Sequence, residues 1–205
     1  MGAWVSYRYD VFLSYRRIGD WSRFVERSFL PMLTHWLSEE LDDPARIFYD
    51  RGELQPGGDW PQELAEAIAV SKVMICLWSK QYFTSDWCKA ELAHMLARRE
   101  SVGGTPLAKL VIPVVIHDGQ SIPESLGSIS RFEIQDYASP YLANDSRTRE
   151  ELSQRLKKLA ESVGQALAKA PPFDPAWAGI TTRQFDYLFT AKHGQYTVPS
   201  LGDAS

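Results

Sequence analysis

The run KVMICLW at residues 72–78 is the feature that most limits what this chain can fold into. It is almost entirely apolar, and it has the length of a strand. A strand with this pattern must be covered on both faces, as the central strands of a parallel sheet are. The run therefore predicts the middle of a parallel sheet that has helices packed against both of its sides.

Shorter apolar runs alternate with helical patterns along most of the chain, which is typical of repeated βαβ units. Strands are predicted at 9–15, 46–50, 72–78, 109–116 and 131–134. Helices are predicted at about 21–41, 60–70 and 147–169, and from the cap residue Ser85 onward. Pro31 should kink or divide the first helix, and Pro113 predicts an edge-ward position or a bulge in the fourth strand. The predicted fold is an α/β, flavodoxin-like five-stranded parallel sheet with helices on both faces.

The regular pattern stops at about residue 170. We therefore predict one domain at 1–170 and an aromatic-rich C-terminal extension at 171–205. The extension carries Phe173, Trp177, Phe185, Tyr187, Phe189 and Tyr196 without a clear period. Because aromatic residues argue against disorder, we expect the extension to pack on the domain or on a neighbouring subunit, with a partly ordered tail as the alternative.

Composition excludes several classes of function. The net charge is −4 and there is no long basic run, so nucleic-acid binding is not expected. The apolar runs are too short to cross a bilayer and no signal peptide is visible, so we expect a cytoplasmic protein that does not bind membranes. Cys76 and Cys88 are expected to be free thiols. The scattered histidines show no metal-ligand spacing, and we expect neither a metal nor a cofactor.

Polar side chains follow several predicted strands, at the point where each strand ends. Ser14, Tyr15, Arg16 and Arg17 come at the end of the first strand, Asp50 at the end of the second and Ser79 at the end of the third. In a parallel sheet these positions gather at one edge, where ligands of such folds bind.

Glu91 lies one to two turns into the helix that Ser85 caps, after the third strand. Trp87, Glu91 and Met95 are spaced four residues apart, so they share one face of the predicted helix. From this periodicity alone, Glu91 is as readily a solvent-facing charge beside a core tryptophan as a working carboxylate.

Three stretches, YDVFLSYRR (9–17), FYDRGELQPGGDW (48–60) and SDWCKAEL (85–92), together resemble the Toll/interleukin-1 receptor (TIR) domain family. Their order and spacing agree with that family over about residues 7–169. The second stretch contains the loop that follows the second strand, which is called the BB loop in this family. The pattern is closer to bacterial stand-alone TIR proteins than to the tails of animal receptors, and it does not cover the C-terminal extension.

The resemblance implies one of two functions. Some TIR domains are non-catalytic scaffolds that assemble through the BB loop, and others cleave NAD+ between nicotinamide and ribose. The enzymes use a carboxylate in the tryptophan-containing helix, which here is Glu91, so the enzyme is the favoured reading. The residues that the resemblance implies for substrate binding are Ser14, Tyr15, Arg16, Arg17, Asp50, Leu54, Gly57, Trp60, Ser79 and Trp87.

Several of these residues also have plain structural readings. Arg16 and Arg17 are expected to clamp a pyrophosphate or else to form a solvated pair of charges. Tyr15 would stack on a base or simply pack. The hydroxyl groups of Ser14 and Ser79 would bond either ribose or the main chain.

A single carboxylate suits the expected chemistry. The nicotinamide of NAD+ is already a cation and leaves as a neutral molecule, so no general acid is required. The barrier lies in the oxocarbenium-like ribose, which one carboxylate can stabilise. The expected products are nicotinamide and either ADP-ribose or a cyclic ADP-ribose, with NAD+ as the substrate.

The expected biological role is anti-phage signalling by a small messenger to a separate effector protein, with direct NAD+ depletion or a virulence role as alternatives. Self-association through the BB loop is expected, because TIR enzymes commonly complete their pocket with a neighbouring subunit. A nucleoside deoxyribosyltransferase-like enzyme would also combine a related sheet with a glutamate nucleophile. The SYRR and BB-loop stretches argue against that last reading.

Overall fold

The computed structural model describes residues 6–17, 19–49, 60–102, 109–144 and 146–180, without the side chains of residues 60–62. In this part of the chain one sheet contains β1 (Tyr9–Tyr15), β2 (Ile47–Phe48), β3 (Ser71–Trp78), β4 (Val111–Val115) and β5 (Phe132–Glu133). The strand order is β2-β1-β3-β4-β5, and every neighbouring pair is parallel. The predicted flavodoxin-like parallel sheet is confirmed, although β2, β4 and β5 are shorter than expected.

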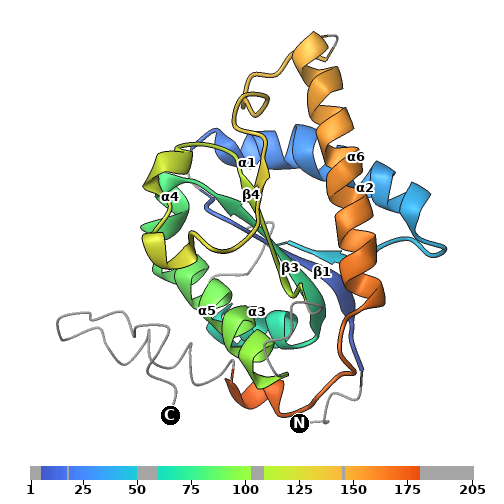
Figure 1. Cartoon of the computed structure of the whole chain (residues 1–205), viewed down its shortest axis with the longest axis vertical. Coiled ribbons are helices and arrows are strands. Elements are labelled where there is room, and N and C mark those ends of the chain that lie inside the picture. The colour runs from blue at the N-terminus through green and yellow to red at the C-terminus, as the bar shows by residue number, and fades with distance from the viewer. Residues whose placement is uncertain (1–5, 18, 50–59, 103–108, 145, 181–205) are drawn as a thin grey trace.

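Helices cover both faces of this sheet (Figure 1). One face is covered by α1 (Trp21–Phe24), the π-helical turn η1 (Val25–Phe29), α2 (Leu30–Glu40) and α6 (Arg147–Ala168). The other face is covered by α3 (Trp60–Ala69), α4 (Lys80–Phe83) and α5 (Asp86–Ser101). Two short 3-10 turns, η2 (Gly119–Ser121) and η3 (Glu124–Leu126), follow β4.

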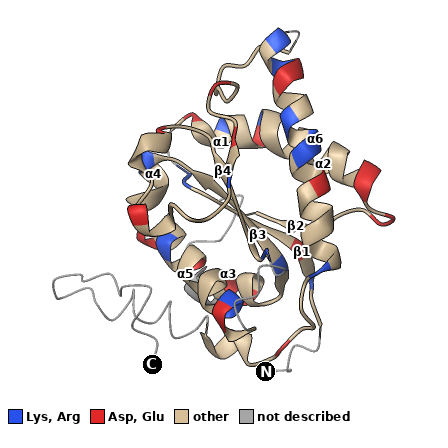
Figure 2. Ribbon diagram, viewed as in Figure 1, with Lys and Arg blue, Asp and Glu red and all other residues tan. Residues whose placement is uncertain are grey.

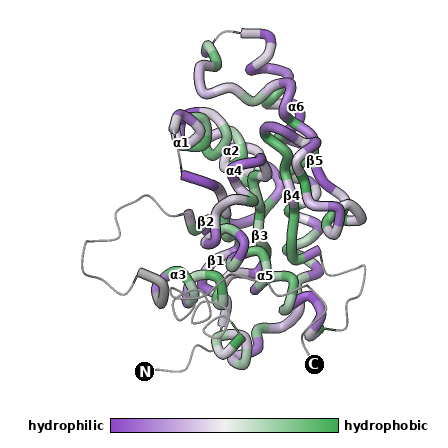
Figure 3. The backbone as a smooth tube through the Cα atoms, turned by 90° about the vertical axis from the view of Figure 1, so that its left-hand side faces the viewer, coloured by the Kyte–Doolittle hydropathy of each residue, from purple (hydrophilic) through white to green (hydrophobic). Residues whose placement is uncertain are grey.

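The alternation of side chains along each strand divides the core into two clusters. In β1, Val11 and Leu13 pack toward α2 and α6, while Phe12 packs toward α3 and α5. In β3, Ile75 and Cys76 divide in the same way. In Figure 3 β3 and β4 appear as green, apolar stretches in the middle of the molecule. Successive side chains of a strand point to opposite faces. Ser14, two residues after Phe12, therefore points to the α5 side of the sheet.

Pro31 divides the first helical region, as the sequence predicts. It lies in the first turn of α2, directly after the π-helical turn η1. The Leu30 amide donates to the carbonyl of Val25, five residues back, instead of four. A proline inside a helix lacks an amide hydrogen and crowds the carbonyl four residues before it, so the backbone widens just ahead of it.

Pro113 lies in β4, which is an interior strand flanked by β3 and β5. The Ile116 amide donates to Trp78 in β3, and amides alternate in direction along a strand, so the nitrogen of Pro113 faces the β5 side. The pairing of β5 begins one residue later, at Val114. Pro113 therefore removes no hydrogen bond between strands, although it has no amide hydrogen. β4 is not an edge strand, but at Pro113 its β5 side is still unpaired, as it would be at an edge.

The longest described helix, α6, carries charge of both signs along its exposed side. Figure 2 shows acidic and basic residues interspersed along it, and Arg147 pairs with Glu151 at 2.8 Å. No helix among the described residues has the length and apolar character needed to cross a bilayer.

A charge cluster ties the amino ends of three strands together. The Arg46 main-chain amide and Nε both donate to Asp10 Oδ2, at 3.0 and 3.1 Å, and Lys72 Nζ lies 2.8 Å from Asp10 Oδ1. Burial would raise the pKa of Asp10, but the hydrogen bonds from Arg46 and Lys72 outweigh it and lower the pKa from 3.8 to about 2. The carboxylate thus joins the starts of β1, β2 and β3.

This cluster predicts acid-sensitive stability. A carboxyl group whose pKa is lowered by folding stabilises the fold above its unfolded pKa, and that contribution is lost as the pH falls from about 4 to about 2. We expect Asp10→Asn to lower the free energy of unfolding at pH 7 by about 1–2 kcal/mol, after allowing for partial exposure. The same variant should lose less stability than the wild type between pH 4 and pH 2, measured by denaturant titration. Equal slopes for the two proteins would contradict the role of Asp10.

Residues 171–180, called here the C-terminal strap, lie against the amino edge of the sheet. The Tyr7 hydroxyl donates to the carbonyl of Pro171 at 2.8 Å, and the Tyr7 ring contacts Phe173 and Trp177. Trp177 is 2% exposed, and its ring lies 4.1 Å from the guanidinium carbon of Arg98 in α5. Residues 181–205 lie outside the described residues, so the predicted packing of the full extension and the boundary at 170 stay predictions.

Candidate functional site

The helix that carries Glu91 is fixed at its first turn by Ser85. The Ser85 hydroxyl accepts from the Cys88 amide at 3.3 Å, as expected of an N-cap residue. The same hydroxyl accepts from Arg16 Nη1 at 3.0 Å. Because Arg16 directly follows β1, this contact joins the end of the first strand to the start of α5.

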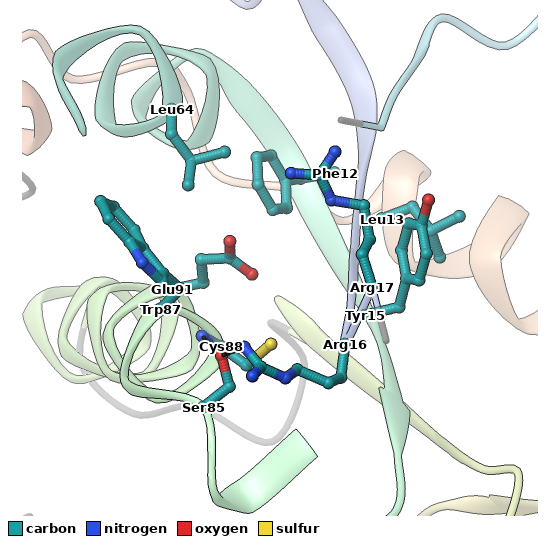
Figure 4. A pocket seen from close by; sticks show the side chains of 10 residues that line it. All are labelled: Phe12, Leu13, Tyr15, Arg16, Arg17, Leu64, Ser85, Trp87, Cys88 and Glu91. Carbon is teal, nitrogen blue, oxygen red and sulfur yellow. Dashed lines mark hydrogen bonds between the residues drawn. The ribbon is translucent and has the colours of Figure 1, made fainter. Parts of the chain in front are cut away.

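A pocket of about 120 Å³ opens at the carboxyl end of β1 (Figure 4). Residues of β1 and its following loop form one wall, α5 forms the opposite wall, and Leu64 of α3 closes one side. The lining residues are Phe12, Leu13, Tyr15, Arg16, Arg17, Leu64, Ser85, Trp87, Cys88 and Glu91. The site therefore lies where β1 and β3 meet and the strand order reverses, the usual ligand position in open parallel sheets.

Glu91 is the carboxylate of this pocket, and only 7% of the residue is exposed. In Figure 4 its carboxylate points across the pocket toward β1, and its Oε2 lies 2.5 Å from Ser14 Oγ, within hydrogen-bond distance. The reading of Glu91 as a solvent-facing surface charge is therefore wrong. An acid held this far from bulk water attracts a cationic centre more strongly than an exposed one does.

Two further groups at the pocket, Cys88 and Arg16, affect the chemistry that it can support. Burial, followed by the charge of Glu91, raises the pKa of the Cys88 thiol to about 12, so the thiol stays protonated and is not a nucleophile at neutral pH. Arg16 Nε is buried and has no hydrogen-bond partner among the described residues. A guanidinium group with an unused N–H at a pocket wall is suited to bind an anionic ligand group.

The structure brings together about half of the residues that the sequence nominated. Tyr15, Arg16, Arg17, Trp87 and Glu91 line the pocket, and Ser14 contacts Glu91 from behind.

Ser79 does not line the pocket. Its hydroxyl accepts from the Tyr82 amide at 3.2 Å and caps α4, which is the main-chain reading of that residue. Trp60 is the first residue of α3, but its side chain is not described. Asp50, Leu54 and Gly57 lie outside the described residues, as does most of the BB loop.

Sequence reasoning missed the apolar walls and one buried hydroxyl. Phe12 and Leu64 form apolar walls of the pocket. Their positions in the apolar pattern of a strand and a helix predict only that they belong to the hydrophobic core. Tyr82 is fully buried, with its hydroxyl 2.9 Å from Ser14 Oγ. It belongs to the four-residue helix α4, which is too short to produce a helical pattern in the sequence.

Among the described residues, no group of three or more His, Cys, Asp or Glu side chains is placed to hold a metal ion. His117 Nδ1 pairs with Asp118 Oδ2 at 2.7 Å after β4, and neither residue lines the pocket.

The fold and the site define an α/β domain with a flavodoxin-like sheet and a buried carboxylate beside the end of its first strand. A family model described as TIR domain matches residues 11–153, which is more than half of the chain. The chain belongs to the TIR domain family.

Plant proteins are among its relatives. The Arabidopsis thaliana protein SUPPRESSOR OF npr1-1, CONSTITUTIVE 1 is 30% identical over 167 residues, which is 81% of this chain and 10% of that protein. TMV resistance protein N from Nicotiana glutinosa is 35% identical over 107 residues, which is 52% of this chain and 8% of that protein. The chain therefore spans about a tenth of the length of these relatives.

Two solved structures also match. The TIR domain of the Toll-related receptor TRR-2 from Hydra magnipapillata has 18% identity and a TM-score of 0.44, covering 61% of this chain and 83% of that one. The TIR domains of the activated Roq1 resistosome have 22% identity and a TM-score of 0.40, covering 89% of this chain and 98% of that one.

Proposed function

We propose that this TIR domain cleaves NAD+ at the bond between nicotinamide and ribose, with Glu91 as the catalytic carboxylate. The observation that carries the proposal is the Glu91 side chain itself, which is 7% exposed and faces a pocket with apolar walls. A carboxylate that is shielded from bulk water and also lines a pocket is placed to meet a cationic ligand there. The proposal makes NAD+ a substrate and requires no further cofactor.

The reaction needs stabilisation of one developing positive charge. The C–N bond breaks, its electron pair passes to the nicotinamide nitrogen, and neutral nicotinamide leaves. The ribose then carries the positive charge, which the Glu91 carboxylate stabilises by its charge or captures transiently. Water adds to the ribose and loses a proton to give ADP-ribose, or a nucleophile of the same molecule closes a ring to give a cyclic product.

The remaining pocket residues fit the rest of this substrate. Phe12, Leu64 and Trp87 are suited to the flat, apolar nicotinamide ring. Arg16 and Arg17 lie on the β1 side of the pocket and are suited to the pyrophosphate.

The described walls enclose about 120 Å³, less than the roughly 300–1,000 Å³ of ligand sites. They therefore suit one end of NAD+. We propose that the BB loop and a neighbouring subunit supply the rest of the site, so that assembly and activity are linked.

The proposed role is immune signalling. One of the plant relatives described above is named as a TMV resistance protein, which supports a role in defence. We propose the bacterial form of that role, in which an ADP-ribose product acts as a messenger for a separate effector protein during phage infection.

The direct test is incubation of the purified, concentrated protein with NAD+, followed by chromatography and mass spectrometry. We expect nicotinamide to appear in equal amount to ADP-ribose or to a cyclic product of lower mass by one water. If no nicotinamide is released under conditions that promote assembly, the proposed NAD+-cleaving activity is wrong. The alternative function, a non-catalytic scaffold that assembles through the BB loop, would then stand.

A further inference from the structure

A chain of buried hydroxyl groups runs from Glu91 into the protein, away from the pocket. Ser14 Oγ lies 2.5 Å from Glu91 Oε2, and the Tyr82 hydroxyl lies 2.9 Å from Ser14 Oγ. The Tyr82 hydroxyl also donates to the main-chain carbonyl of Cys88, at 3.2 Å. Ser14 and Tyr82 are 1% and 0% exposed, so bulk water does not reach these contacts.

Three separate elements hold this chain in place. Ser14 is at the end of β1, on the face that packs against α5, and it pairs in register with Cys76 of β3. Tyr82 belongs to α4, whose first turn is capped by the Ser79 hydroxyl. Glu91 and the Cys88 carbonyl belong to α5. The hydroxyl groups therefore have little freedom to leave one another.

The number of hydrogens available to these contacts depends on Glu91. Burial raises the pKa of Tyr82 well above its ordinary value of 10.0, so its hydroxyl remains protonated. Ser14 and Tyr82 together supply two hydrogens, while the three contacts need three. The Cys88 carbonyl can only accept a hydrogen bond, and so can the ionised Glu91 carboxylate.

Two arrangements follow from this count. If Glu91 is ionised, Ser14 donates to it, and the single hydrogen of Tyr82 must be shared between Ser14 and the Cys88 carbonyl. If Glu91 carries a proton, Glu91 donates to Ser14, Ser14 donates to Tyr82, and Tyr82 donates to Cys88, so all three contacts are filled.

We propose that Ser14 and Tyr82 form a hydroxyl relay that holds a proton on Glu91 in the empty pocket and reverses direction when that proton leaves. The catalytic role of this relay rests on the NAD+ cleavage proposed above. Tyr82 acts through Ser14 and is a positioning residue. A cationic nicotinamide riboside arriving in the pocket favours the ionised carboxylate, and the proton of Glu91 passes to water on the pocket side. Ser14 then donates to Glu91, and Tyr82 turns its hydrogen toward Ser14 to support the new charge.

Other ionisable groups also face Glu91. Arg16 and Arg17 lie on the β1 side, and Cys76 of β3 and Cys88 of α5 lie near it. Burial raises the pKa of both thiols, so they stay neutral, and a thiol is too weak a donor to replace the missing hydrogen. The two arginines favour the ionised form in every variant considered below, so differences between variants report on the relay.

The relay predicts the sign of one substitution. In Tyr82→Phe, a protonated Glu91 would donate to Ser14, and the hydrogen of Ser14 would then have no acceptor. An ionised Glu91 would still accept the hydrogen of Ser14. Loss of the Tyr82 hydroxyl therefore favours the ionised form. If Tyr82 instead served only to stabilise the carboxylate, its loss would favour the protonated form.

The measurement is the titration of Glu91 by ¹³C NMR in protein labelled at the glutamate side-chain carboxyl carbon. The Glu91 signal is identified by its absence in Glu91→Gln. We expect Tyr82→Phe to lower the titration midpoint by about one pH unit, a tenfold change in the proton equilibrium. In a Ser14→Ala background the same substitution should have no effect, because the coupling passes through Ser14. Tyr137→Phe, on the other face of the sheet, is the matched control and should leave the midpoint unchanged.

Replacement of Tyr82 by 4-fluorophenylalanine covers the case in which Tyr82→Phe does not fold. The fluorine nearly fills the space of the hydroxyl group but has no hydrogen to donate and accepts only weakly, so the relay again predicts a lower midpoint, whereas a Tyr82 that only stabilised the carboxylate predicts a higher one. In an active enzyme, the acidic limb of kcat/KM against pH should move with the midpoint. If Tyr82→Phe lowers the midpoint but the wild type does not cleave NAD+, the relay is supported and the proposed function is overturned. An unchanged or raised midpoint in a folded variant overturns the relay, whether or not that variant cleaves NAD+.

Discussion

Glu91→Gln should reduce the rate of NAD+ cleavage by at least about 10²–10³-fold, the usual loss when one group that stabilises a transition-state charge is removed. Glutamine has nearly the same shape, and its amide can keep a hydrogen bond with Ser14 Oγ, which lies 2.5 Å from Glu91 Oε2 in the wild type. What disappears is the negative charge beside the ribose. The loss should therefore appear in kcat, with the thermal midpoint of unfolding close to that of the wild type.

Glu100→Gln is the matched control for this substitution. Glu100 lies on the same helix, α5, but it is exposed and does not line the pocket. It should cleave NAD+ at the wild-type rate. If Glu91→Gln retains more than about a tenth of the wild-type kcat, the carboxylate supplies less than about 1.4 kcal/mol and cannot be the catalytic group.

Arg98→Ala should lower the free energy of unfolding by about 3 kcal/mol, the second large effect that the structure predicts. Arg98 is fully buried, and its Nη1 donates to the carbonyls of Ile68 and Ser71, at 3.1 and 2.9 Å. Its guanidinium lies on the ring of Trp177, 4.1 Å from the centroid. Burial lowers the pKa of Arg98 to about 10, which still leaves it charged at neutral pH.

The expected loss combines two charge-assisted hydrogen bonds and a cation–π contact, partly offset by the cost of burying the charge. Arg99→Ala, at the next position of α5, is the control and should change stability by less than about 0.5 kcal/mol. Trp177→Ala should cost about as much as Arg98→Ala, because it removes the ring that covers the guanidinium. Denaturant unfolding of the double variant should show a loss smaller than the sum, since the two side chains share one contact. Simple additivity would contradict a joint role for Arg98 and the C-terminal strap.

The sheet could be predicted from the sequence because its interior strands are buried on both faces. β1 has the predicted bounds, and β3 begins one residue early, since continuous apolar runs mark such strands clearly. β2 and β5 were predicted too long. They are edge strands that pair along one side only, so their length depends on a neighbour that local sequence does not reveal.

The candidate site was predictable where a helical period placed residues on one face, as with Trp87 and Glu91. The burial of Glu91 was not, because the pattern fits a surface position equally well. Tyr82 was missed for a different reason. Its hydroxyl contacts Ser14, a residue 68 positions away in the sequence. This contact depends on the start of α4 at the Ser79 cap, which places Tyr82 beside the end of β1.

The two outermost strands of the sheet have a consequence for how this domain assembles. β2 and β5 are each two residues long, so they present very few free main-chain groups along the borders of the sheet. Extended peptides and second copies that add to a sheet need a longer free border to form a continuous ladder. Polymers of this domain should therefore grow by side-chain contacts between loops and helices, and they should dissolve in mild denaturant where cross-β fibrils would persist.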